Sequence, residues 1–180
     1  MSENPFDYRQ ARAYASHFGL WIGLMWIVSF VCSMRSFDHM LLGHLGNIMA
    51  IFSFFALVRQ VKNYRYLISD MSLLQCCWMC FTICIYAGLI TTGVQALYFH
   101  FFDNGHLADS LSNMFAQEEY RILFEQYLAV QKPEDVIEMI QGMSISDIIV
   151  QMMTINLTIS MLFAIFGGML AYRGKVRQTE

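Results

Sequence analysis

Four of the five cysteines lie close together on one apolar stretch, where thiols could carry redox or metal chemistry: Cys76, Cys77, Cys80 and Cys84. A quinone-linked disulfide-forming membrane enzyme would need redox cysteines in its loops outside the membrane, and residues 103–147 contain none. The cluster is also a poor metal site, because a set of three of these thiolates in lipid would lack a fourth ligand from a nearby Cys or His. We therefore interpret these cysteines as small apolar packing residues, with palmitoylation or redox sensing as alternatives.

The histidines and methionines show little of the spacing that metal sites require. A site joining His44, His100 and His106 is conceivable, because all three lie near the same ends of the apolar stretches. The 14 methionines show no M-x-x-M clustering beyond the adjacent Met152 and Met153, so copper handling is not supported. We predict no catalytic residue, no metal and no cofactor, and hence a protein that is not an enzyme.

Weakly polar residues inside the apolar stretches form a second candidate set: Asn47, Thr91, Thr92, Gln95 and Asn156. Asn47 lies nine residues in from Asp38 and Asn156 nine in from Asp147, so we expect one polar layer at a common depth. Such a layer can consist of hydrogen bonds between helices, worth about 0.6 kcal/mol each. It can also line a hydrated substrate pocket.

The elements that position these residues are four runs without Asp, Glu, Lys or Arg, at residues 13–34, 39–58, 71–102 and 148–172. Crossing a bilayer takes about 20 helical residues, and each run is long enough. The chain is 57% hydrophobic and 14% charged, whereas soluble domains are about 25% charged. The absence of charge from all four runs argues against a coupled transporter.

The fold class that follows is all-α: a polytopic membrane protein with a four-helix transmembrane bundle. We expect one membrane domain over residues 1–180, with spans at about 14–34, 40–58, 73–98 and 148–172. Eight Lys and Arg lie before the first run, between the second and third runs, and after the fourth run. Only three lie in the other two segments between runs, residues 35–38 and 103–147. The positive-inside rule therefore predicts that both termini are cytoplasmic.

The gap at residues 103–147 is acidic and is expected to be a helical extracytoplasmic segment. Asp103-Asn104-Gly105 predicts a turn. A helix predicted from residue 113 would carry one apolar face, at Tyr120, Leu123, Phe124, Tyr127 and Leu128. A second short helix would start at Pro133 and stop at Gly142, and Ser144–Asp147 resembles a capping box for the fourth span.

Two surfaces could meet a partner. The polar side of the extracytoplasmic helix has few Lys and Arg that would attract anionic lipid, so we expect the apolar face to pack on the bundle's own end or to dock a protein. Small residues recur about every fourth position on three spans, at Ala15, Gly19 and Gly23, at Gly46, Ala50 and Ser53, and at Asn156, Ser160, Ala164 and Gly168. Such stripes pack helices within a bundle or between copies in a homo-oligomer.

Several local runs carry a resemblance to a known family: Tyr14–Gly23, Lys62-Asn63-Tyr64-Arg65, Ala87-Gly88-Leu89-Ile90 and Gln141-Gly142-Met143-Ser144. In these runs the chain resembles the small bacterial membrane proteins known as domain of unknown function 4199, best known from Bacteroidetes. The resemblance covers roughly residues 10–175. It implies four spans and an envelope location, in the bacterial cytoplasmic (inner) membrane, and it carries over no functional residue.

The function predicted from the sequence is that of a non-enzymatic accessory or scaffold protein of the bacterial cell envelope. Its surroundings would be the lipid bilayer, with a protein partner at the extracytoplasmic helix or a second copy of the chain. No basic field suits nucleic acid. The alternative is a small permease or channel-like transporter that uses the polar layer, which is expected in the outer half of the bundle.

Overall fold

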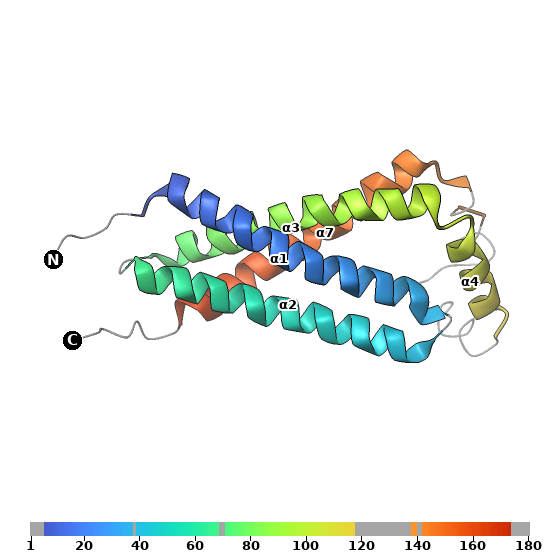
Figure 1. Ribbon diagram of the computed structural model, residues 1–180, viewed down its shortest axis with the longest axis horizontal. Helices are drawn as coiled ribbons and strands as arrows, with labels where there is room; N and C mark the ends of the chain where they lie inside the picture. The colour runs from blue at the N-terminus through green and yellow to red at the C-terminus, as the bar shows by residue number, and fades with distance from the viewer. Residues whose placement is uncertain (1–5, 38, 69–70, 118–137, 140–141, 174–180) are drawn as a thin grey trace. The chain divides into compact units, whose positions relative to one another are not determined.

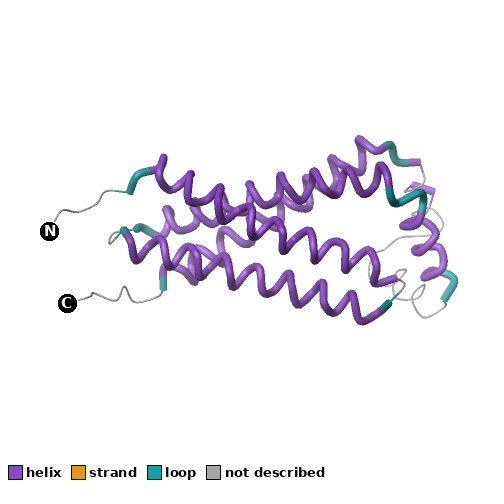
Figure 2. The backbone as a smooth tube through the Cα atoms, in the orientation of Figure 1, coloured by secondary structure: helices purple, strands orange, loops and turns teal. Residues whose placement is uncertain are grey.

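Four long helices make up most of the computed structural model, which describes residues 6–37, 39–68, 71–117, 138–139 and 142–173 (Figures 1 and 2). They are α1 (Tyr8–Met34), α2 (Met40–Leu67), α3 (Leu73–Phe101) and α7 (Ile145–Tyr172). All four are long and apolar enough to cross a membrane, and the described residues contain no strand. The prediction of an all-α, multi-pass membrane bundle is confirmed.

The helices extend beyond the spans that the uncharged runs delimit. Helix α1 begins at Tyr8 rather than near residue 14, and the carboxylate of its N-cap Asp7 accepts a hydrogen bond from the Arg9 amide at 2.8 Å. Helix α2 continues past residue 58 to Leu67. Charged residues end the apolar run, but they are good helix formers and do not end the helix.

The chain divides into two compact units, residues 1–94 with 152–180 and residues 95–151. The first unit, hereafter the bundle unit, contains α1, α2, most of α3 and most of α7. Trp26 of α1 contacts Ser53 of α2, whereas Tyr14 near the start of α1 contacts Gln60 further along α2, so these helices are antiparallel. The described contacts give an up-down-up-down order.

Glycines set the close approaches between helices of the bundle unit. A Cβ added to Gly19 of α1 would lie 2.5 Å from Cβ of Tyr86 on α3, and one added to Gly46 of α2 would lie 3.0 Å from the Ser29 carbonyl oxygen on α1. A side chain at Gly19 would force its neighbours to shift, and one at Gly46 would be tighter than most side-chain contacts. The predicted stripes at Gly19–Gly23, around Gly46 and at Gly168 therefore contribute to packing inside the bundle unit.

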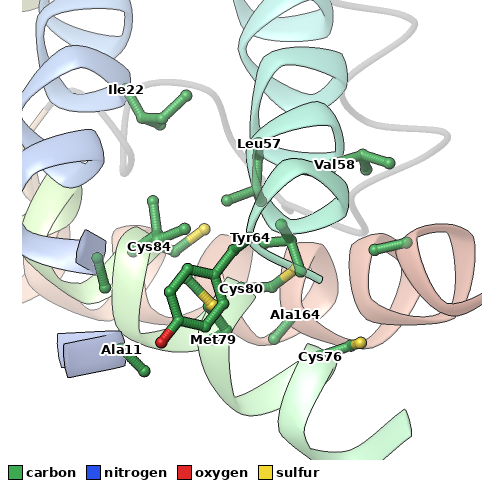
Figure 3. Packing of buried hydrophobic residues seen from close by; sticks show 14 of the residues in the cluster. Ala11, Ile22, Leu57, Val58, Tyr64, Cys76, Met79, Cys80, Cys84 and Ala164 are labelled. Carbon is green, nitrogen blue, oxygen red and sulfur yellow. The ribbon is translucent and has the colours of Figure 1, made fainter. Parts of the chain in front are cut away.

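Cysteines share the core with larger apolar side chains (Figure 3). Cys76, Cys80 and Cys84 have no exposed surface, and they lie in one cluster with Ile22, Leu57, Val61, Tyr64, Met79 and Ile83. Cys77 is partly buried and lies against Gly168 of α7. A thiol is small enough to let α3 and α7 come close together, and it still fills the space between them.

Aromatic rings and one arginine gather where α1 and α3 begin and α2 and α7 end, a region called here the terminal end. The Tyr14 hydroxyl donates to the Gln60 carbonyl oxygen at 3.2 Å. Arg65 Nη1 donates to the carbonyl oxygens of Ala171, at 3.2 Å, and Tyr172, and its Cζ lies 4.8 Å from the centre of the Tyr172 ring. Arg65 of α2 thus caps the last turn of α7.

The second unit contains a helix that the sequence pattern did not lead us to predict. The expected turn at Asp103-Asn104-Gly105 is present, with φ of 44° at Asn104 and 85° at Gly105. Helix α4 (His106–Phe115) follows it, and the Asp103 carboxylate accepts a hydrogen bond from the Leu107 amide at 3.2 Å. The spacing of Leu107, Leu111 and Met114, at i, i+4 and i+7, is typical of one apolar helix face and could have predicted this helix.

Other predictions for this segment meet different outcomes. The capping box is confirmed: the Asp147 carboxylate accepts from the Ser144 amide at 3.0 Å, and the Asp147 amide donates to the Ser144 hydroxyl at 3.3 Å. The helix predicted from residue 113 is described only to residue 117, and there α4 ends at Phe115. Its apolar face, from Tyr120 to Leu128, lies outside the described residues. A single domain over the whole chain stays a prediction.

Candidate functional site

A hydrogen-bonded polar cluster lies inside the bundle unit, between α3 and α7. The Asn156 side-chain amide of α7 donates to the Thr92 hydroxyl oxygen of α3 at 2.8 Å. Thr92 and Asn156 are each 8% exposed, so solvent or lipid scarcely reaches them. Four residues further along α7, the Ser160 hydroxyl donates to the Asn156 carbonyl oxygen at 2.7 Å. We call Thr91, Thr92, Asn156 and Ser160 the polar cluster.

The local sequence explains how these side chains come together. On α3, Gly88 lies one turn before Thr92, and a Cβ added there would be 3.6 Å from Cβ of Asn156. That distance is an ordinary van der Waals contact, so α3 and α7 lie close together beside the Thr92–Asn156 hydrogen bond. Thr91 points to α1 instead, where its hydroxyl lies 3.4 Å from the Gly23 carbonyl oxygen and 2.9 Å from that of Ala87 on its own helix.

A second polar contact inside the bundle unit was not predicted. The Trp26 indole N–H of α1 donates to the Ser53 hydroxyl of α2 at 3.0 Å, and Ser53 in turn donates to the Ala50 carbonyl oxygen at 2.7 Å. The Trp26 ring also meets the Phe163 ring of α7 edge to face, with centroids 6.0 Å apart. A tryptophan in mid-span needs a partner for its N–H, and that rule could have pointed to Trp26.

The chemistry available to the polar cluster is that of neutral hydrogen-bonding groups. Hydroxyls and a carboxamide donate and accept hydrogen bonds, and neither ionises near neutral pH. The cluster can therefore hold helices together or bind a neutral polar group. These groups cannot themselves hold a proton in transit or balance the charge of an ion, as acidic and basic side chains do in pumps.

The predicted polar layer is only partly assembled. Thr92 and Asn156 come together in the bundle unit, whereas Thr91 contacts α1 at Gly23. Gln95 is 6% exposed and belongs to the second unit. Asn47 is exposed on α2 and is not among the buried polar residues of the cluster. Counting residues along the chain predicts its depth but says nothing about the direction in which the helix turns its side chain.

The cysteines occupy helix contacts. A Cβ added to Gly167 of α7 would lie 3.4 Å from the Cys80 sulfur, and one added to Gly168 would overlap Cys77. All five cysteines are free thiols. Within the described residues, no group of three or more His, Cys, Asp or Glu side chains is arranged to hold a metal ion. These contacts favour the packing interpretation.

Comparison with known protein families matches residues 17–173 to a family described as "Protein of unknown function (DUF4199)". The matched residues include all of α2, α3 and α7. The polar cluster lies on α3 and α7. Searches of curated proteins and of solved structures gave no match.

Proposed function

This chain belongs to the DUF4199 family of proteins of unknown function, and we propose that it is a non-enzymatic accessory or scaffold protein of a bacterial cell envelope. The observation that carries the proposal is the use of the buried polar groups. The Asn156 amide reaches Thr92, and the Trp26 indole reaches Ser53. These buried polar groups are hydrogen-bonded between helices, so they stabilise the bundle and are not free to bind a substrate. A stable bundle suits a protein that supports another protein.

The partner surface in this proposal is the apolar face of residues 120–128, which lies outside the described residues. Its sequence spacing gives five large apolar side chains on one side of a helix, with acidic residues on the others. A face of that composition suits a protein partner, because few basic residues are present to attract anionic lipid.

Copurification from membranes in mild detergent tests the docking role. With the wild-type chain as bait, a specific envelope protein should copurify in a defined ratio. Tyr127→Glu places a charge on the apolar face and should remove that partner. Gln126→Glu adds the same charge off the face and should retain it. A partner retained equally by both variants, or a chain that always purifies alone, contradicts the proposal.

Orientation is part of the same proposal: both termini in the cytoplasm of an inner-membrane protein. The support is the excess of Lys and Arg at the N-terminus, between α2 and α3, and after α7. A fluorescent protein fused after residue 180 should fluoresce, because the reporter folds in the cytoplasm. Alkaline phosphatase at the same position should be inactive. The reverse pattern would invert the assignment of sides.

A small permease or channel-like transporter is the second candidate, favoured only by the burial of Thr91, Thr92 and Asn156 at one level of the bundle unit. If these groups lined a pathway, Asn156→Leu would change uptake or conductance in liposomes. The scaffold proposal predicts the same flux for the wild-type chain, Asn156→Leu and empty liposomes. The Thr158→Val variant is the control, because the Thr158 hydroxyl is exposed and donates within α7 to the Thr154 carbonyl oxygen.

A further inference from the structure

One strongly polar side chain on α2 is exposed where lipid should be. Asn47 is the ninth of the 20 residues in the uncharged run 39–58, and a run of that length just spans the hydrocarbon layer. The side chain therefore lies near the middle of the bilayer. It is exposed on the chain's surface, and among the described residues its amide has no hydrogen-bond partner.

An unsatisfied amide is unfavourable at this depth because hydrocarbon offers neither donors nor acceptors. The neighbouring residue, Gly46, packs against α1, within 3.0 Å of the Ser29 carbonyl oxygen when a Cβ is added. That contact fixes the rotation of α2 and turns Asn47 away from α1. The asparagine side chain is also too short to reach the headgroups from mid-bilayer, so its partner has to come from outside the described part of the chain.

The residues around Asn47 are spaced like the seam of a coiled coil. Met40, His44, Asn47 and Ile51 follow one another at intervals of four, three and four, which is the heptad pattern of residues that face a second helix. All four are exposed, Met40 by 77% and Ile51 by 60%. One asparagine in such a seam is the feature that sets register and the number of strands.

We propose that this chain forms a homodimer in the membrane through α2, with the Asn47 amides of the two copies hydrogen-bonded to each other across a twofold axis. A second copy is the occupant that fits, because a carboxamide carries both a donor and an acceptor and is its own complement. Symmetry brings identical residues together near the axis. The proposal is independent of docking at residues 120–128 and stands if that docking fails.

Photobleaching of single fluorescently labelled chains in liposomes, over a range of protein-to-lipid ratios, measures the association. The wild-type chain should bleach mainly in two steps. Asn47→Leu should weaken dimerisation about tenfold, within the range expected for hydrogen bonds between membrane helices. Asn47→Gln, which keeps the carboxamide, should retain most of it. Thr158→Val removes a polar group that is also exposed but already hydrogen-bonded within α7, and should change nothing.

Cross-linking gives a readout that does not depend on the asparagine variants. A cysteine at position 51 (Ile51→Cys) should form a disulfide between two copies under oxidation. A cysteine at the exposed position 157 on α7 (Leu157→Cys) should not. Single-step bleaching of the wild-type chain at every ratio overturns the proposal. Dimers that Asn47→Leu leaves intact, or that cross-link through position 157 instead of 51, overturn it as well.

Discussion

The terminal end and the polar cluster hold the same helices together by different means. At the terminal end, α3 and α7 touch through backbone and thiol at Cys77 and Gly168, and Arg65 caps α7. At the polar cluster, the same two helices meet through the Thr92–Asn156 hydrogen bond. Close packing between backbones leaves no space for an added methyl group, whereas a single hydrogen bond in a membrane contributes little to the free energy of unfolding. The two regions should therefore respond very differently to substitution.

The largest effect is expected from one methyl group at the terminal end. A Cβ on Gly168 would lie 2.7 Å from Cα and 2.8 Å from N of Cys77. Gly168→Ala should lower the free energy of unfolding by about 3 kcal/mol, the upper part of the usual range for overpacking. The midpoint of thermal unfolding in mild detergent measures this effect.

Two controls isolate the contact at Gly168. Gly93→Ala on α3 meets no atom within 4 Å and should keep or slightly raise stability, because alanine is the better helix former. Adding Cys77→Ala to Gly168→Ala should not restore stability, because the clash involves the backbone of Cys77. Equal losses for Gly168→Ala and Gly93→Ala would mean that α3 and α7 do not touch there.

Loss of the arginine cap should have the next largest effect. Arg65→Met removes the donor to the Ala171 and Tyr172 carbonyl oxygens and the cation over the Tyr172 ring. We expect a loss of about 2 kcal/mol in the same unfolding assay, typical of hydrogen bonds from a charged group. Arg65→Lys should lie between, because it keeps the charge and loses the planar fork. The exposed Arg59→Met should stay within about 0.5 kcal/mol of wild type.

A pair of tyrosines should respond with opposite signs. The Tyr64 hydroxyl is buried and has no hydrogen-bond partner among the described residues, so Tyr64→Phe should stabilise the protein by about 1 kcal/mol. The Tyr14 hydroxyl donates to the Gln60 carbonyl oxygen, so Tyr14→Phe should destabilise it slightly. Thermal unfolding of both variants decides the matter. A loss of stability in Tyr64→Phe would show that its hydroxyl has a hydrogen-bond partner outside the described residues.

The smallest effect is expected at the polar cluster. A double-mutant cycle of Thr92→Val and Asn156→Leu should give a coupling free energy of about 0.6 kcal/mol, the average for hydrogen bonds inside membrane proteins. Thr158→Val paired with Asn156→Leu should show no coupling. If the coupling free energy between Thr92 and Asn156 were as large as the loss of stability in Gly168→Ala, the two regions would not differ in their response to substitution.

The sequence predicted the number of long apolar helices and three of the four residues of the polar cluster, because both depend on position along the chain. The exclusion of charge from four runs of sufficient length is enough to locate the spans. The sequence analysis placed Thr92 and Asn156 in one polar layer because they were expected at the same depth in the membrane. Helix ends were less predictable, since Arg59, Lys62 and Arg65 continue α2. The continuation matters, because it places Arg65 beside α7.

Rotation and register account for the rest. Asn47 was predicted at the depth of the polar cluster, but the packing of Gly46 on α1 turns its side chain to the surface, and no count along one helix reveals that. The Trp26–Ser53 hydrogen bond joins residues 27 positions apart. Predicting it requires the register of α1 against α2, which Gly46 and Ser29 set through backbone contact.

The short link between α1 and α2 has a consequence for how the protein enters the membrane. Only Arg35–His39 separate Met34 from Met40, and the His39 amide donates back to the Arg35 carbonyl oxygen at 3.0 Å. A link of this length cannot cross a bilayer. The two helices must therefore cross the bilayer in opposite directions, and reversing either of them would reverse both.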